Sequence, residues 1–447
     1  MRIDPEVKVV TNTTTIGRPV DVRQLLRLEE GLVHSDVYAS APVFDLEIEK
    51  IFHKGWVYVA HESEIPNPGD YVRRWIGKQS VIVNRDSDGQ MHLFMNRCRH
   101  RAVAVCDADH GNTSLFRCAY HGWTYRNTGE LVGVPSREGA YGASFRLQDY
   151  PLVSPRMAVY RGFIWGNLAD DGKSLDEHLG VAGKHAIDLF CDASPEGEII
   201  LRQGCLKGVI HANWKFQGGD GYHAPFTHQT TFMHVRAKRL GQPVPNFAPG
   251  RMEDGYLSRD LGQGHYCLDR RSAGRGSKLP DAPWAHEYRD ALIRSHGKER
   301  AEYVMRCNGN PHAVFMPNLH LVNVSDVRLI RPLAVDRFEI YFYCAFLKGV
   351  PHELNEMRLR DTEDRMGPAG SINPDDVEMF ERNQLGMQQM VDPWMVMSRG
   401  MEREYIDDDL ITPEAYRWGG TLAGHMTDEV TQRAQLRWWA QHLSQPD

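Results

Sequence analysis

Short segments with the hydrophobic pattern of β-strands fill the chain from Trp56 to about residue 170. Runs rich in valine, isoleucine and aromatic residues occur at 56–60, 71–76, 80–84, 91–94, 114–117 and 163–166. Turn-forming sequences such as Pro66-Asn-Pro-Gly-Asp70 and Asp86-Ser-Asp-Gly89 lie between these runs. Many short strands at regular spacing predict a small antiparallel barrel or sandwich.

The chain after about residue 170 mixes helical and strand patterns. We expect helices at 174–180, 182–189, 213–228, 285–295, 375–390 and 428–443, and strands at 198–210, 313–324 and 337–347. The glycine- and proline-rich stretch 240–281 is expected to be a long excursion from the core. Residues 1–45 form a polar lead-in with a short helical pattern at 21–31. The sequence therefore predicts a β-rich module followed by an α+β body.

Length, composition and charge narrow the class of protein. With 447 residues, 41% of them hydrophobic and 25% charged, the chain resembles an average soluble globular protein of two or three domains. A net charge of −7 without a dense Lys/Arg block argues against a nucleic-acid or membrane-surface partner. The acidic N-terminal residues are unlike a secretory signal, and apolar runs such as 340–347 are too short for a membrane helix. We therefore expect a cytoplasmic protein. Its eight scattered cysteines and 21 histidines indicate metal in a reducing compartment.

Two short pairs of metal-ligand residues stand out in the β-rich module. They are Cys98-Arg-His100 and Cys118-Ala-Tyr-His121, with seventeen residues between His100 and Cys118. Each pair follows a strand-like segment, so two neighbouring loops can hold one metal centre between them. Two thiolates and two imidazoles suit tetrahedral zinc, or a [2Fe–2S] cluster with two histidines on one iron. Zinc fingers normally group their cysteines in one loop and their histidines in the other, whereas here each loop supplies one of each.

The two pairs closely resemble the motif of the Rieske ferredoxins, written here as Cys-Arg-His-Arg from Cys98 and Cys-Ala-Tyr-His-Gly-Trp from Cys118. The resemblance implies a [2Fe–2S] cluster held by Cys98, His100, Cys118 and His121. Neutral imidazoles in place of anionic thiolates raise the reduction potential of such a cluster. A Rieske centre transfers single electrons, and it does not by itself choose a reaction.

A second candidate metal site lies further along the chain, within Asn213-Trp-Lys-Phe-Gln-Gly-Gly-Asp220-Gly-Tyr-His223-Ala-Pro-Phe-Thr-His228. Asp220 and His223 are three residues apart and would share one face of a helix. His223 and His228 are five residues apart, about 140° around an ideal helix, and Pro225 provides the distortion needed for both to reach one ion. Two histidines and one carboxylate form the facial triad of non-haem Fe(II) oxygenases.

The two constellations in this order resemble the catalytic α subunit of the Rieske non-haem iron aromatic-ring-hydroxylating oxygenases, from about Trp56 to the C-terminus. The second motif matches the family at Asn213, Trp214, Lys215, Asp220, Tyr222, His223 and His228. The match implies that His223 and His228 bind a mononuclear iron. It also implies that Asp220 bridges, by hydrogen bonds, to the Rieske ligand His121 of an adjacent subunit.

The resemblance places a third iron ligand after a Gly-Pro-Ala-Gly stretch, here Gly367-Pro-Ala-Gly370. Asp376 is the first choice for this carboxylate, Asp375 is the second, and Glu378 is less favoured. A plainer role for the aspartate pair is to stabilise a helix N-terminus through the helix dipole, and that role is compatible with iron binding.

The family resemblance implies fold, activity and partners together. We expect an all-β Rieske domain at 46–170, inserted near the N-terminus of a helix-grip-like catalytic domain with an antiparallel sheet, formed by 171–447 and the lead-in 1–45. The implied reaction is cis-dihydroxylation of an aromatic ring by O₂, with a Rieske cluster and mononuclear Fe(II) as cofactors. The implied partners are a small β subunit in an α₃β₃ assembly and a separate NADH-dependent reductase, with or without a ferredoxin. The chain itself lacks a Gly-x-Gly-x-x-Gly segment after a strand.

Three other functions stay open from the sequence. A monooxygenase or a demethylase would use the same two metal centres. A pure electron carrier needs only the first module, and a zinc-stabilised binding module would use the cysteine–histidine pairs without iron. Iron and zinc analysis separates the electron carrier and the zinc module from an oxygenase, and labelling with oxygen-18 gas separates monooxygenation from dioxygenation.

The substrate pocket is the least predictable part of the site. Only four residues separate Lys215 from Asp220, about one helical turn fewer than many members of the family have. We expect the pocket walls to include Phe216, Gln217, His312, Met366 and Ile372.

Overall fold

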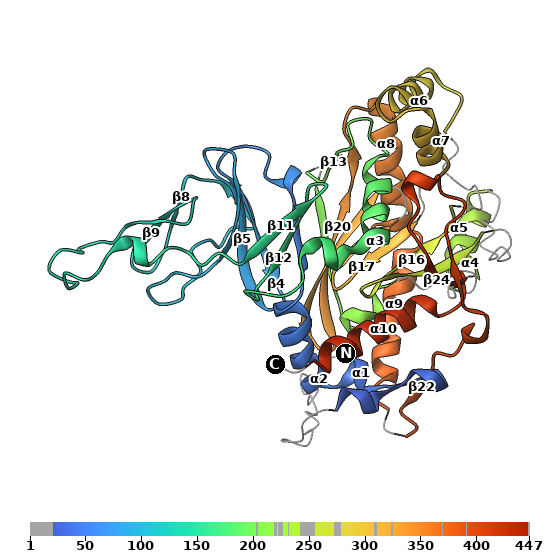
Figure 1. The fold of residues 1–447 in the computed structure, drawn as a ribbon, viewed down its shortest axis with the longest axis horizontal. Coiled ribbons are helices and arrows are strands. Elements are labelled where there is room, and N and C mark those ends of the chain that lie inside the picture. The colour runs from blue at the N-terminus through green and yellow to red at the C-terminus, as the bar shows by residue number, and fades with distance from the viewer. Residues whose placement is uncertain are drawn as a thin grey trace, which may run out of the picture.

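The computed structural model describes residues 21–445, except 203, 219–220, 222–226, 231, 242–254, 272–278, 308–310, 323–324, 369 and 390. A β lobe, built from residues 57–167, lies beside a larger α+β body (Figure 1). Strands β8 and β9 of the lobe extend farthest from the body (Figure 1). The predicted fold class, an all-β module joined to an α+β body on an antiparallel sheet, is confirmed.

Short antiparallel strands form the β lobe, as the spacing of the hydrophobic segments predicted. They pair in the orders β6-β5-β4-β7, β11-β12-β3 and β10-β9-β8. Their bounds are β3 (Val57–His61), β4 (Asp70–Ile76), β5 (Gln79–Arg85), β6 (Met91–Met95), β7 (His110–Asn112), β8 (Leu115–Arg117), β9 (Thr124–Arg126), β10 (Leu131–Gly133), β11 (Arg156–Tyr160) and β12 (Phe163–Asn167). The outer part of the lobe has its own core, in which Phe94, Phe116 and Tyr125 pack around Cys98 and Cys118.

A long antiparallel sheet forms the centre of the body. Among the described residues it has nine strands, in the order β14-β20-β19-β18-β17-β16-β15-β24-β23. Their bounds are β14 (Cys205–Ile210), β15 (Leu257–Gly262), β16 (His265–Asp269), β17 (His312–Phe315), β18 (Leu319–Val322), β19 (Asp326–Ala334), β20 (Arg337–Cys344), β23 (Tyr405–Asp407) and β24 (Thr421–His425). A separate two-stranded sheet pairs β13 (Ile199–Ile200) with β21 (Phe346–Leu347).

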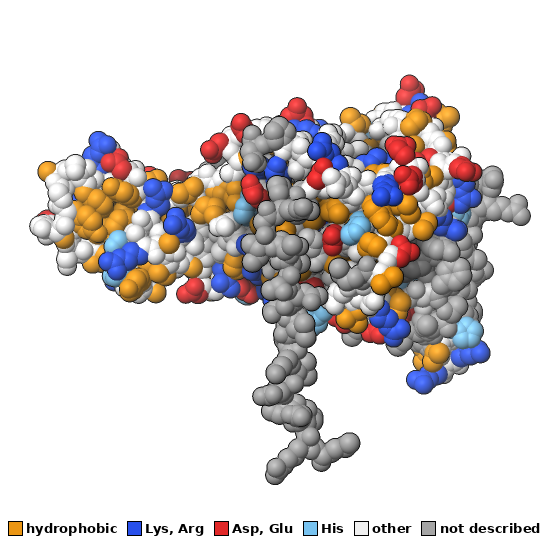
Figure 2. Space-filling model, turned by 90° about the horizontal axis from the view of Figure 1, so that it is seen from below, with side chains coloured by type: hydrophobic (Ala, Val, Ile, Leu, Met, Phe, Trp, Pro, Cys, Tyr) orange, Lys and Arg blue, Asp and Glu red, His pale blue; other side chains and the backbone are white. Residues whose placement is uncertain are grey.

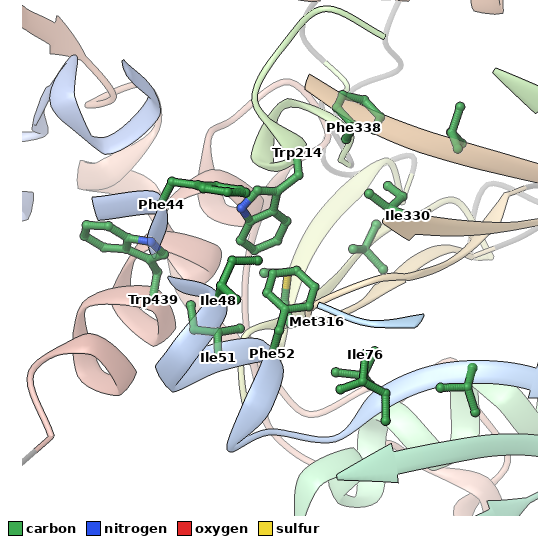
Figure 3. Close-up of a cluster of buried hydrophobic side chains, with 14 of the residues drawn as sticks. Phe44, Ile48, Ile51, Phe52, Ile76, Trp214, Met316, Ile330, Phe338 and Trp439 are labelled. Atoms are coloured by element: carbon green, nitrogen blue, oxygen red, sulfur yellow. The ribbon is translucent and has the colours of Figure 1, made fainter. Parts of the chain in front are cut away.

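Alternate side chains of each strand face opposite sides of this sheet. Ala313 and Phe315 of β17 face one core, which also receives helices α3 (Leu175–Cys191), α6 (Pro283–His296), α7 (Lys298–Cys307) and α8 (His352–Asp361). Val314 of the same strand faces the other core, together with Ile330 and Ile340. Figure 3 shows this second core, where Met316, Ile330 and Phe338 approach hydrophobic side chains of the N-terminal helices and Trp214.

The second core is covered by segments from both ends of the chain. Helices α1 (Asp36–Ala39), α2 (Ala41–Glu47) and η3 (Ile48–His53) pack there with the C-terminal helix α10 (Val430–Leu443). Helix α9 (Asn373–Gly386) lies on the same side and contributes Val377 and Phe380. The described part of the lead-in therefore packs onto the body, and at Phe44 and Asp45 it also contacts Lys78 of the β lobe.

Three predicted elements are wrong. Residues 21–31 form no α-helix but the 3₁₀ turns η1 (Val22–Leu25) and η2 (Leu28–Glu30) around β1 (Leu26–Arg27), because β2 (Leu32–His34) pairs with the distant β22 (Trp394–Val396). The described residues 255–271 of the stretch 240–281 are not an excursion, since β15 and β16 lie inside the long sheet. The helix expected over 213–228 is replaced, where described, by η6 (Trp214–Phe216) and α4 (Thr227–Thr230), which precedes α5 (Phe232–Arg239).

The other predicted helices and strands match elements of the structure, with small shifts at their ends. The two helices expected at 174–189 are one element, α3, which has a non-helical backbone at Gly180. Within the described ranges, no helix has the length and hydrophobicity needed to cross a membrane.

Candidate functional site

The two cysteine–histidine pairs lie on two loops that have the same pattern of backbone hydrogen bonds. In each loop the cysteine N–H donates to the carbonyl five residues later, at 2.8 Å, and the N–H four residues later donates back to the cysteine carbonyl, at 3.0 Å. The backbone therefore turns through positive φ at equivalent positions, 63° at Ala102 and 72° at Gly122. A Cβ atom at Gly122 would lie 2.9 Å from Pro135 Cγ, so glycine is needed there for space as well as for conformation.

These loops bring together the four ligands predicted for the cluster. The Cys98 and Cys118 thiols are free and almost fully buried. The rings of His100 and His121 lie 4.7 Å apart, and within the described residues the buried Nδ1 atom of each lacks a hydrogen-bond partner. A buried polar nitrogen without a partner is costly, and a metal supplies one. Two buried thiols and two such imidazoles fit a [2Fe–2S] cluster of the Rieske type.

The surroundings of His100 favour its neutral, metal-binding form. Burial, and next the neighbouring His121, lower the pKa of His100. Nowhere in the described ranges do three or more His, Cys, Asp or Glu side chains gather around a single ion. A binuclear cluster needs no such group, because each of its irons takes only two protein ligands.

Aromatic side chains enclose the histidine side of this centre. Trp123 stacks on His100 with ring centroids 5.2 Å apart, and it packs edge-on against Tyr141, Phe145 and Tyr150. On the cysteine side, the Tyr125 hydroxyl lies 3.4 Å from Cys98 Sγ and accepts a hydrogen bond from the Arg99 N–H at 3.0 Å.

The surface around these loops is apolar and flanked by arginines. Leu115, Tyr120, Val132 and Tyr141 are each more than a third exposed. Figure 2 shows hydrophobic side chains gathered on the β lobe, with Lys or Arg and His side chains beside them. The predicted cluster therefore lies close to a surface that another protein can approach.

The described part of the second candidate site consists of His228 and the N-terminus of α9. The Nε2 atom of His228 lies 3.3 Å from Asp376 Oδ1, and its Nδ1 atom lies 3.4 Å from Asp375 Oδ2. Pro374 at the start of α9 and the two aspartates in its first turn are typical of a helix N-terminus. One imidazole therefore lies between two adjacent carboxylates.

Asp220, Tyr222 and His223 lie outside the described residues, so their predicted roles stay predictions. The expected pocket residues have varied surroundings where the structure describes them. Phe216 stacks on Tyr38 at 4.6 Å, and Gln217 is buried. His312 is half-buried on β17, and Ile372 precedes α9. The Met366 side chain lies outside the described residues.

Several residues that support the second site were missed from the sequence. The fully buried carboxylate of Glu47 accepts hydrogen bonds from Lys215 Nζ at 2.5 Å and Trp214 Nε1 at 2.8 Å. It also accepts one from Trp439 Nε1 at 2.6 Å. Gln384 of α9 contacts the backbone of Asn213. A glutamate within a hydrophobic helical stretch was the one signal that could have indicated Glu47.

Comparison with known proteins connects these two sites. A family model described as "Rieske [2Fe-2S] domain" matches residues 55–151. A second model, "Ring hydroxylating alpha subunit (catalytic domain)", matches residues 177–445. The chain is 34% identical over 383 residues to the anthranilate 1,2-dioxygenase large subunit of Acinetobacter baylyi, covering 82% of this chain and 79% of that protein.

Two further comparisons add a second reaction type and a solved structure. Over 206 residues the chain is 39% identical to the N,N-dimethyl phenylurea N-demethylase α subunit of a Sphingobium species, which covers 45% of this chain and 44% of that one. The crystal structure of naphthalene 1,2-dioxygenase from Rhodococcus sp. bound to indole superimposes with a TM-score of 0.79 at 29% identity, over 95% of this chain and 99% of that one.

Proposed function

Because the chain belongs to the family of Rieske ring-hydroxylating oxygenase α subunits, we propose that it uses O₂ and electrons from a separate reductase to cis-dihydroxylate an aromatic ring. The proposal is carried by one observation: the same chain holds a cysteine–histidine centre fitted for a Rieske cluster and a histidine between two carboxylates fitted for a mononuclear iron. The relatives reported above act on different compounds that share an aromatic ring.

We assign the residues of the two centres as follows. Cys98, His100, Cys118 and His121 hold the [2Fe–2S] cluster, and the unpartnered Nδ1 atoms are the nitrogens available to it. His223, His228 and Asp376 hold the mononuclear iron. Two histidines and one carboxylate leave positions open for O₂ and substrate, which is the chemistry that the iron supplies when bound.

The residues around the centres have supporting roles in this proposal. Trp123 and its aromatic neighbours keep water from one side of the cluster. Phe216, Gln217, His312, Met366 and Ile372 are the proposed pocket walls. Residues 46–170 form the electron-transfer domain, and residues 171–447 together with 1–45 form the oxygenation domain.

Electrons must cross between subunits in this proposal. The loops of the Rieske centre lie towards the end of the β lobe, whereas α4 and α9 belong to the body (Figure 1). We propose a head-to-tail ring of three chains, in which Asp220 of one chain contacts His121 of the next. Asp220→Asn is then expected to abolish most turnover while both metal centres stay loaded, and normal turnover would contradict the bridge.

The proposed partners are those of an α subunit. A small β subunit would complete an α₃β₃ assembly, and a reductase, with or without a ferredoxin, would bring electrons from NADH. We place the protein in the cytoplasm, where NADH is supplied.

A demethylase or monooxygenase is the second candidate, favoured by the phenylurea N-demethylase relative. Oxygen-18 gas separates the two reactions. We expect both labelled atoms in the cis-dihydrodiol product, and one labelled atom per product molecule would show monooxygenation. Metal analysis comes first, with about three irons per chain expected, two in the cluster and one alone. Zinc without the absorbance of a Rieske cluster would contradict both candidates.

A further inference from the structure

The two segments that carry the candidate iron ligands are joined by a buried side-chain amide. The Asn213 N–H donates to Gln384 Oε1 at 2.8 Å, and both residues are more than 95% buried. Gln384 Nε2 in turn donates to Tyr38 O at 3.3 Å. Asn213 opens the turn that leads to His228, while Gln384 belongs to the helix that begins at Asp375 and Asp376.

Gln384 lies where it can fix the position of α9 along the helix axis. It follows Asp376 by eight residues, which is about 12 Å along the helix. Glu381, one turn before Gln384 on the same face, accepts a hydrogen bond from the His211 N–H at 3.1 Å. Two side chains of α9 therefore hold the backbone at 211–213. A slip of α9 by one turn would break both contacts and would move Asp376 away from His228.

The other side of the Asn213 turn is fixed independently of α9. Asn213 Nδ2 donates to Tyr38 O at 3.1 Å and to Val335 O at 2.8 Å. Glu47 of α2 holds the next two residues, Trp214 and Lys215, through the hydrogen bonds described above. Figure 3 shows the indoles of Trp214 and Trp439 beside Phe44 of the same helix. The turn is thus anchored to the sheet and the N-terminal helices, and α9 is placed against that anchored turn.

We propose that Gln384 is a positioning residue for the mononuclear iron: it holds α9 at the level where Asp376 meets His228. This inference rests on the proposed function, because it assumes that iron binds between these two side chains. A metal site tolerates displacements of its ligands of only about 0.2 Å, so a buried contact that fixes the ligand helix affects metal affinity more than its contribution to folding suggests.

The test compares Gln384→Met with a matched control, Asn318→Leu. Asn318 is also a buried amide with two backbone hydrogen bonds, from the Tyr58 N–H at 2.9 Å and to Tyr58 O at 2.8 Å, but it joins β3 of the β lobe to the turn after β17. Both variants are expected to lose comparable stability in urea. The measurements are the urea midpoint, the Rieske absorbance, and the dissociation constant of the mononuclear Fe(II) by competition with a chelator.

We expect Gln384→Met to weaken Fe(II) binding by about tenfold or more, with the Rieske absorbance unchanged, and Asn318→Leu to leave Fe(II) affinity at the wild-type value. Equal Fe(II) affinity in Gln384→Met and wild type would overturn the inference, and so would an equal loss in both variants. If Gln384→Met does not fold, Glu381→Ala tests the same attachment from a partly exposed position, and unchanged Fe(II) affinity there would count against it. A wild-type protein that holds the cluster but no third iron would instead refute the proposed function.

Discussion

The Nε2 atom of His228 lies 3.3 Å from the Oδ1 atom of Asp376. Two ligand atoms that are each about 2.1 Å from one metal, at right angles to each other, lie about 3 Å apart. On the opposite side of the ring, Nδ1 makes a hydrogen bond of 3.4 Å with Asp375 Oδ2. A carboxylate at the second nitrogen of a ligand histidine fixes the orientation and tautomer of the ring. The distances therefore favour Asp376 as ligand and Asp375 as the residue that orients His228.

Substitution of the two aspartates should separate these roles. Asp376→Ala is expected to lose the mononuclear iron and all turnover while it keeps the Rieske absorbance. Asp375→Asn is expected to keep the iron but to bind it about 10- to 100-fold more weakly, because the orienting carboxylate is lost. Iron content and chelator competition measure both effects. The reverse pattern, with iron lost only in the Asp375 variant, would exchange the two assignments.

Tyr125 should raise the reduction potential of the cluster. Its hydroxyl lies 3.4 Å from Cys98 Sγ, and its oxygen already accepts the Arg99 N–H, so its proton is available to the sulfur. Burial, and next the contact with Cys98, raise the pKa of Tyr125, which keeps this proton in place. A donor to the sulfur stabilises the more negative reduced cluster. Removing one hydrogen bond in Tyr125→Phe is expected to lower the potential by about 40–60 mV.

A redox titration of the Rieske absorbance measures this shift. Tyr120→Phe is the matched control, because Tyr120 is 58% exposed and lies in the same pair of loops. Its potential is expected to equal that of the wild type. Equal potentials in all three proteins would show that the Tyr125 hydroxyl does not act on the sulfur.

The fold was predictable where local pattern and long-range pairing agree. The strands of the β lobe alternate in hydrophobicity and are bounded by turns, and the structure has them within a few residues of the predicted positions. Residues 21–31 have a helical pattern, yet the pairing of β2 with β22, more than 350 residues away, replaces it with strands and turns. Glycines and prolines in 240–281 suggested a loop, although β15 and β16 lie within the sheet. Long-range tertiary contacts determine the secondary structure of such segments, and the local sequence pattern carries no information about those contacts.

The candidate sites were predictable to different degrees for the same reason. The cysteine–histidine loops are short local motifs, so their spacing in the sequence already determines which side chains meet. Asp376 and His228 are 148 residues apart, and the family resemblance suggested the pairing that their close approach now supports. Glu47 and Gln384 belong to no motif. Their roles arise from burial and from contacts that span most of the chain.

Acid should destabilise the body through buried neutral histidines. Burial lowers the pKa of His265 from 6.5 to about 4, and the ring accepts the Met316 N–H at Nδ1. The unfolded chain therefore binds a proton that the folded chain does not, between pH 6.5 and about 4. Stability is complete above pH 6.5 and is lost as the pH falls towards 4, by about 3 kcal/mol for this group.

Urea unfolding between pH 4.5 and 7.5 measures this dependence. His265→Gln removes the titrating group and is expected to be less stable than the wild type at pH 7.5 but to lose less stability on acidification. His286→Gln is the control, because that imidazole is largely exposed. An unchanged pH slope in His265→Gln would show that other groups cause the acid sensitivity.

Complementation should reveal whether electrons pass between chains. Cys118→Ala removes a proposed ligand of the cluster, and His228→Ala removes a proposed ligand of the iron, so each variant alone is expected to be inactive. Consider a head-to-tail ring built from equal amounts of the two variants. A contact between neighbouring chains supports turnover only when the intact Rieske centre of one chain meets the intact iron site of the next. This is the case at about a quarter of the contacts. Co-expression is therefore expected to restore roughly a quarter of the wild-type turnover.

The result depends on where the two centres lie within one chain. The loops beside β8 and β9 lie towards the tip of the β lobe, whereas the helices α4 and α9 belong to the body (Figure 1), and the proposed bridge joins the two centres across a contact between chains. Separately purified variants that are mixed without exchange of subunits serve as the control and should stay inactive. If co-expressed variants also stay inactive while both form rings of normal size, electrons travel within one chain, and the proposed contact between Asp220 and His121 of its neighbour is wrong.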